Sequence, residues 1–146
     1  MAPNSTWGVT PRDSIDRECA RRGRGSVVSG CRALLRGNRA DPDLLLALGG
    51  PAAHAFLDDP DRADAYWLRV WGARGLLWAW DESATEDIRT ALSDEAWRVR
   101  EMAIKVIARH QVGSLVSDVA QLRSDDVARV RLAADRALAV LTAGQA

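Results

Sequence analysis

Indole and guanidinium side chains recur at helical spacing in the middle of this sequence. Residues 66–80, YWLRVWGARGLLWAW, contain four of the six tryptophans in a chain that has one Phe and one Tyr. Intervals of three or four residues, which place side chains on one stripe of an α-helix, separate Trp67, Trp71, Arg74 and Trp78. Indole and guanidinium groups stack on nucleobases and anchor partner helices. We therefore identify this tryptophan stripe as a candidate binding surface.

Two largely basic stripes follow the tryptophan stripe along the chain. When the sequence is shifted by 31 residues once and then twice, the positions of the tryptophan stripe fall on Arg98, Met102, Lys105 and Arg109, and then on Arg129, Ala133, Arg136 and Val140. We predict that the three stripes lie side by side. Their basic residues, which are Arg98, Lys105, Arg109, Arg129 and Arg136, would then favour an acidic protein partner.

The tryptophans also have a structural interpretation. The helix predicted over 25–36 offers small residues on which large rings can pack, namely Gly25, Ser29, Gly30 and Ala33. Burial of each ring would contribute about 1.5–3 kcal/mol to the stability of the fold. Packing and binding are compatible if one of the rings is exposed. We expect Trp71 to be buried because it falls in the middle of its helix, and Trp67 or Trp78 to be partly open.

Other kinds of site chemistry have little support in the sequence. His54 and His110 have no Cys or acidic residue at metal-ligand spacing, so we expect no metal site. The segment RRGRGS at 21–26 lacks the third glycine of a dinucleotide-binding loop, and we expect no cofactor. No Ser, Thr or Cys has a recognisable activating partner, and we expect no catalytic residue. Cys19 and Cys31 are expected to be reduced, although paired helices would bring them together.

The elements that position these stripes repeat at a fixed interval. LRVWGARGL (68–76), VREMAIKVI (99–107) and VRLAADRAL (130–138) share an aliphatic residue followed by Arg, then a small residue at the fifth position and an aliphatic one at the ninth. Residues at i, i+4 and i+8 share one helix face, and small residues let a neighbouring helix approach closely. The small residues are Gly72, Ala103 and Ala134. A period of about 30 residues predicts stacked helix pairs.

Helix pairs are predicted over four parts of the chain, about 11–37, 42–80, 83–110 and 114–142. Residues that favour helix N-termini mark their starts: Thr10 and Asp41 before prolines, Ser83 with Glu86 as a capping box, and Ser93 and Ser124. No segment alternates as a strand does, so the sequence predicts an all-α fold. The segments 1–10 and 143–146 are expected to fray.

This pattern resembles HEAT repeats of the short bacterial type. The resemblance is carried by Asp94 before Val99-Arg100 and by Asp125 before Val130-Arg131, and it is strongest over 83–142. It implies an α-solenoid, a right-handed superhelical stack of about four helix pairs whose inner helices line a concave surface. It also implies a ladder of acidic and basic side chains along the stack. We predict that Asp94 and Asp125 form this ladder with Arg100 and Arg131.

Composition places the chain among soluble globular proteins. Its 146 residues, of which 47% are hydrophobic and 27% charged, are enough for one domain with a core. The formal net charge of zero conceals an excess of basic residues in 1–40 and 97–146 and of acidic residues in 41–96. No apolar run approaches the roughly 20 residues of a membrane span, and no secretory signal is recognisable. We therefore expect a cytoplasmic protein without membrane contact.

Three functions are compatible with these features. The resemblance implies a non-catalytic scaffold or adaptor that binds another protein through its concave surface, and we favour this function. One alternative is a nucleic-acid-binding module, because alkylpurine DNA glycosylases are also built from HEAT-like repeats. WAWD at 78–81 places Asp81 beside indoles, and AWRVR at 96–100 is similar to a helix start in that family. The chain is shorter than those enzymes, and acids near Asp81 would repel phosphate. The other alternative is an accessory subunit of an enzyme.

Overall fold

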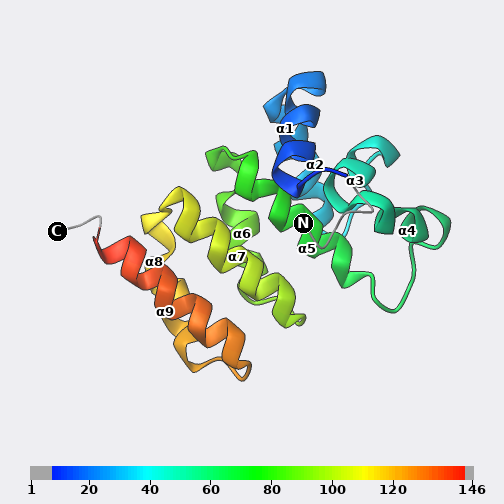
Figure 1. The fold of residues 1–146 in the computed structure, drawn as a ribbon. Coiled ribbons are helices and arrows are strands. Elements are labelled where there is room, and N and C mark those ends of the chain that lie inside the picture. The colour runs from blue at the N-terminus through cyan, green and yellow to red at the C-terminus, as the bar shows by residue number, and fades with distance from the viewer. Residues whose placement is uncertain (1–7, 144–146) are drawn as a thin grey trace. The chain divides into compact units, whose positions relative to one another are not determined.

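Residues 8–143, the part of the chain that the computed structural model describes, are mainly helical, and no strand occurs there (Figure 1). The predicted all-α fold class is confirmed for these residues. The chain forms two units, one ending at Asp81 and the other beginning at Glu82, whereas the sequence predicts a single domain. Of the segments predicted to fray, 1–7 and 144–146 lie outside the described residues.

The first unit consists of α1 (Pro11–Arg22), α2 (Arg24–Leu35), α3 (Pro42–Gly49), the 3₁₀ turn η1 (Gly50–Ala53), α4 (His54–Asp58) and α5 (Tyr66–Trp78). The helix α1 packs on α2 and α3, and α5 packs on the same two helices. The predicted caps are confirmed at two helix starts. Thr10 Oγ1 accepts a hydrogen bond from the Asp13 N–H at 3.1 Å, and Asp41 Oδ1 accepts one from the Leu44 N–H at 2.9 Å. Both residues precede a proline in the first turn, where no N–H is needed.

Two glycines of α5 allow this helix to pack closely against α2. A methyl group on Gly72 would lie 2.9 Å from the carbonyl oxygen of Cys31 and 3.0 Å from Cβ of Leu34. A methyl group on Gly75 would overlap Cys31 Sγ and would lie 2.8 Å from Leu48 Cδ2. These distances are shorter than packed carbon atoms tolerate, so both positions require glycine for the helices to pack this closely. At these positions α5 therefore presents backbone, and not large rings, to α2.

The second unit consists of η2 (Glu82–Ala84), α6 (Thr85–Ala91), α7 (Trp97–His110), η3 (Gly113–Leu115), α8 (Val116–Gln121), η4 (Leu122–Ser124) and α9 (Ala128–Ala143). The helix α6 packs on α7, α8 packs on α9, and α7 packs on α9. The positions shared by the sequence repeats form the core of this unit. The side chains at these positions are fully buried in α7 (Val99, Ala103 and Ile107) and in the first half of α9 (Val130 and Ala134). Leu138, the last of these positions in α9, is half-buried.

Aspartates, and not the predicted serines, organise the turns before α7 and α9. Asp94 Oδ1 accepts a hydrogen bond from the Ala96 N–H at 2.8 Å, and Asp125 Oδ1 accepts one from the Val127 N–H at 2.9 Å. The start of α6 also lies later than the predicted capping box places it. The helix α6 begins at Thr85 after Ala84, which offers no side-chain cap, and Ser83 lies within the preceding 3₁₀ turn.

One ion pair of the kind predicted for the ladder joins two repeats, and its partners differ from the predicted pairs. Arg100 donates through Nε and Nη2 to the Asp125 carboxylate of the next repeat, at 2.8 and 3.0 Å. Within a repeat, Arg100 donates to the backbone carbonyl of Asp94 at 2.8 Å, and Arg131 donates to that of Asp125 at 2.6 Å. The predicted pairs therefore meet through carbonyls, because each carboxylate turns toward the N–H two residues on. Burial alone raises the pKa of Asp125, but the hydrogen bonds from Arg100 and from the Val127 N–H outweigh it and lower the pKa.

Candidate functional site

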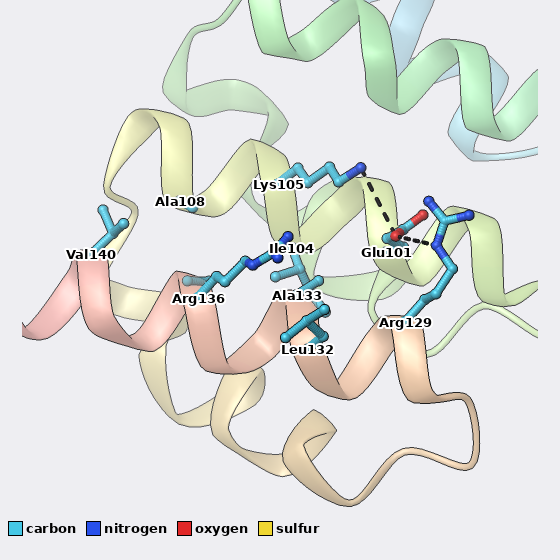
Figure 2. A pocket seen from close by; sticks show the side chains of 10 residues that line it. Glu101, Ile104, Lys105, Ala108, Arg129, Leu132, Ala133, Arg136 and Val140 are labelled. Atoms are coloured by element: carbon cyan, nitrogen blue, oxygen red, sulfur yellow. Dashed lines mark hydrogen bonds and ion pairs between the residues drawn. The ribbon is translucent and has the colours of Figure 1, made fainter.

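A groove between α7 and α9 in the second unit is the candidate site (Figure 2). Its volume is about 220 Å³. The floor is formed by small or apolar side chains, which are Ile104, Ala108, Ala133 and Ala137. The rim combines charged and aliphatic side chains: Glu101, Lys105, Arg129, Leu132, Arg136 and Val140. The groove can therefore contact a ligand that has both apolar and ionic groups.

The charged groups of the rim are three cations and one carboxylate. Glu101 Oε2 accepts a hydrogen bond from Arg129 Nε at 3.1 Å and lies 3.9 Å from Lys105 Nζ. Glu101 therefore bridges α7 and α9 and compensates part of the positive charge (Figure 2). The Arg136 side chain extends from α9 toward α7 in the same view. The rim keeps a net positive charge, which attracts anionic groups to an otherwise apolar groove.

The aliphatic groups of the rim are unusually open to solvent. Among the large apolar side chains of residues 8–143, the two that are exposed are Leu132, at 49%, and Val140, at 40%. Both lie on α9 and both line the groove. Isolated exposed aliphatic side chains are common on protein surfaces. Two of them on one groove, between cations, are instead typical of a binding surface.

Lys105, Arg129 and Arg136, three of the five predicted basic residues, meet at this groove. The guanidinium of Arg98 lies 4.4 Å from the ring centre of Trp97, and that of Arg129 lies 5.3 Å from the same ring. Arg98 is half-buried, and Arg109 is exposed near the end of α7. The structure thus places Arg98 against an indole and three other basic residues around the groove.

The tryptophan stripe belongs to the first unit, where it borders a different hollow. Trp67, Trp71 and Arg74 line this hollow of about 520 Å³ together with Phe56. The rings of Trp67 and Trp71 have centres 6.5 Å apart, and Phe56 meets Trp71 edge-on at 5.2 Å. Arg74 donates through Nη2 to the carbonyl oxygen of Leu48 at 2.6 Å. The aromatic and basic groups of this hollow are therefore engaged with one another and with the backbone of α3.

The burial of the indoles agrees with their positions along α5. Trp71 is 5% exposed, and its ring occupies the space that a side chain on Gly49 would need, 2.7–2.8 Å from such a methyl group. Trp67 is half-buried and stacks on Tyr66, with ring centres 5.4 Å apart. Trp78 is also half-buried, and the Arg12 guanidinium lies 5.0 Å from its ring centre. The stripe is therefore part core and part surface.

Two residues of the groove rim lie outside the predicted stripes. Glu101 and Leu132 occupy the same position in successive repeats, one residue after the repeated arginine, and correspond to Val70 in the first repeat segment. This position was not included in the stripes. The signal that could have identified it is a large aliphatic residue on α9, Leu132, where the preceding repeat carries a carboxylate on α7.

The acidic, histidine and cysteine side chains of the described residues form no cluster suited to a metal ion. Burial raises the pKa of the Cys31 thiol to about 12, so this thiol is protonated at neutral pH. Both cysteines of the chain are present as free thiols. None of the helices described between residues 8 and 143 is long and apolar enough to span a bilayer.

The chain was also compared with known proteins. No protein-family model, no curated protein and no solved structure matches it.

Proposed function

We propose that the protein is a HEAT-like α-solenoid that acts in the cytoplasm as a non-catalytic scaffold and binds another protein. Support for the repeat assignment comes from the second unit. There two helix pairs related by the 31-residue shift pack through α7 and α9, and the Arg100–Asp125 pair joins consecutive repeats. In the family that the sequence resembles, α7 and α9 correspond to inner helices, which line the binding surface.

The observation that carries the proposed function is the groove between α7 and α9. It exposes Leu132 and Val140 beside three cations, and its lining contains no hydroxyl, thiol or imidazole group. Protein interfaces combine an apolar centre with a polar rim in this way. Its volume of about 220 Å³ is smaller than the roughly 300–1,000 Å³ of most small-molecule pockets. A groove of this size suits a few side chains of a partner protein better than a free metabolite.

Nucleic acid is the alternative ligand. The three cations favour it, but Glu101 lies among them and would repel a phosphate group. The aliphatic side chains of the rim offer no stacking surface for a base, unlike aromatic ones. Protein therefore fits this groove better than nucleic acid does.

The proposed function is tested by photo-crosslinking in the cells that produce the protein. A photoreactive amino acid is placed at Leu132 or Val140, and at Ala120, an exposed position of α8, as the control. We expect a discrete protein adduct at the two groove positions, absent at Ala120 and lost when Arg136→Glu is added. Equal adducts at all three positions, or none at the groove, would contradict the proposal.

A further inference from the structure

The partner of the α7–α9 groove can be specified further, on the assumption that the proposed function is correct. We infer that the groove binds an amphipathic acidic helix of a partner protein. One carboxylate of that helix pairs with Arg136. Apolar side chains one helical turn before and one turn after this carboxylate contact Leu132 and Val140.

Arg136 is the cation of the rim that is left to bind an anion. Lys105 and Arg129 already share the carboxylate of Glu101 (Figure 2). Arg136 makes no hydrogen bond or ion pair with any residue that the structure describes, and its acidic neighbour Asp135 pairs with Arg123 at 3.3 Å. A guanidinium beside an apolar groove gains most from a carboxylate that binds through both oxygens.

The spacing along α9 defines what the partner must present. Leu132, Arg136 and Val140 follow one another at intervals of four residues. At 1.5 Å per residue the two aliphatic side chains are about 12 Å apart along the helix axis, with the guanidinium midway. A helix lying along α9 has the same rise, so it matches this surface with an apolar, an acidic and an apolar residue at i, i+4 and i+8. Helix-in-groove recognition uses anchors of this spacing.

The walls of the groove explain why the partner segment is helical. An extended peptide gains backbone hydrogen bonds from its receptor when a strand edge receives them. The walls here are α7 and α9, whose backbone groups are already used within their helices, and no strand occurs in the part of the chain that the structure describes. A helical ligand satisfies its own backbone and needs only side-chain contacts, which this groove supplies.

The charge of the groove matches this ligand. The rim carries Lys105, Arg129 and Arg136 against Glu101, which is three positive charges against one negative charge. An acidic helix is therefore attracted before it docks, and its association slows as salt screens the charges. The aliphatic contacts are less sensitive to salt and set how long the complex lasts.

Synthetic peptides test the inference on the whole chain. The first is a labelled, alanine-based helical peptide with Leu, Glu and Leu at i, i+4 and i+8. The second has the same composition with these residues permuted off one face, and a third carries Arg in place of Glu. Fluorescence anisotropy gives the Kd of each for the wild-type chain and for Arg136→Glu. Arg17→Glu, at an exposed position of α1, makes the same charge change away from the groove.

The wild-type chain and Arg17→Glu are expected to bind the first peptide about tenfold or more tightly than the permuted one. Arg136→Glu should raise the Kd of the first peptide about tenfold or more. The peptide with Arg in place of Glu should bind this variant again. Circular dichroism of each variant confirms that the helices are intact. Failure of this charge exchange would overturn the assignment of Arg136.

Other occupants give distinct results, and each would overturn the inference. Stronger binding of a proline-interrupted version of the first peptide would show that the ligand is extended. Arg136-dependent binding of a labelled single-stranded oligonucleotide, without peptide binding, would assign the groove to nucleic acid. Sedimentation that shows self-association lost in Leu132→Ser would assign it to a second copy of the chain. If the peptides do not bind while the crosslinked adduct at the groove persists in cells, the proposed function stands and the inference of an acidic helical ligand is wrong. If both fail, the proposed function itself is wrong.

Discussion

The α2–α5 contact in the first unit and the α7–α9 contact in the second join comparable helices and give different surfaces. In α5, Gly72 and Gly75 bring the backbone against Cys31, and the seam closes. The corresponding residues of α9, 62 positions further on, are Ala134 and Ala137, and both are buried. Ala137 lies in the floor of the groove. The helix contact with glycine at these two positions is therefore tightly closed, and the contact with alanine at the same positions borders an open groove.

The two units also differ in where they place large apolar side chains. In the first unit the ring of Trp71 fills the space beside Gly49 and contributes to the core. In the second unit the equivalent position is Ala133, and the exposed aliphatic groups lie on the groove instead. Both helices bury the core positions of the repeat, but α5 also buries the large ring of Trp71, whereas α9 exposes Leu132 and Val140.

The largest effect is expected for the core tryptophan. Trp71→Ala removes a buried ring and leaves a cavity, which should lower the free energy of unfolding by about 3–5 kcal/mol. Trp67→Ala, at a half-buried position one turn earlier in α5, should cost clearly less. Urea denaturation followed by circular dichroism measures both. Equal losses for the two variants would contradict the division of the stripe into core and surface.

The next effect concerns the pair that joins the repeats of the second unit. The side chains of Arg100 and Asp125 are 15% and 6% exposed, so Asp125→Asn should lower the free energy of unfolding by about 1.5–3 kcal/mol at pH 7. Asp118→Asn is the matched control. The pair of Asp118 with Arg89, at 3.0 Å, is more exposed, and its loss should cost about 0–1 kcal/mol.

The same pair predicts a dependence on pH. The pKa of Asp125 is lower in the folded protein than the value of about 3.9 in an unfolded chain. Its contribution is therefore complete above about pH 4 and is lost as the pH falls through the folded pKa. The stability difference between the wild type and Asp125→Asn should shrink below pH 4. A difference that stays constant down to pH 2 would show that the carboxylate is not stabilised by Arg100.

The glycine seam should respond to a single methyl group. Gly72→Ala forces a carbon atom against the Cys31 carbonyl oxygen, and overpacking of this kind costs about 1–3 kcal/mol. The higher helix propensity of alanine offsets about 1 kcal/mol of this cost, so a net loss of about 0–2 kcal/mol is expected. Gly25→Ala in α2, where a methyl group would meet no atom within 4 Å, should be neutral or stabilising. A stabilised Gly72→Ala variant would show that the α2–α5 contact is looser than the structure has it.

The sequence was sufficient for the helices and for the three basic residues that line the groove. Periodic apolar positions and caps depend on neighbouring residues, so the repeated core positions and the caps at Thr10 and Asp41 were correctly predicted. Lys105, Arg129 and Arg136 were correctly grouped on their stripes because helical spacing and the 31-residue shift fix which residues share a face. These inferences required no knowledge of tertiary packing.

Other features depend on which atoms meet, and sequence patterns do not contain this information. The carboxylate of Asp125 has two candidate arginines, Arg100 in the preceding repeat and the nearby Arg131, and the structure selects Arg100 because the turn directs the Asp125 carbonyl toward Arg131. The groove requires a free volume between two helices, and this volume results from side-chain sizes on both of them. Leu132 lies one position away from the predicted stripe, so its exposure becomes evident only when α7 is in place.

The smallest effect on stability is expected at the groove. Leu132→Ser and Val140→Ser replace side chains that are 49% and 40% exposed, so each should change the free energy of unfolding by about 0.5 kcal/mol or less. Leu141→Ser, one residue further along α9 and 5% exposed, is the matched control and should cost about 2–5 kcal/mol, as expected for truncation of a buried leucine. Denaturation of the three variants therefore separates the groove face of α9 from its core face. Losses at Leu132 and Val140 that approach the loss at Leu141 would make the groove side chains part of the core and remove the contrast with Trp71. Unchanged stability together with loss of the crosslinked adduct would show that α9 exposes these side chains for binding.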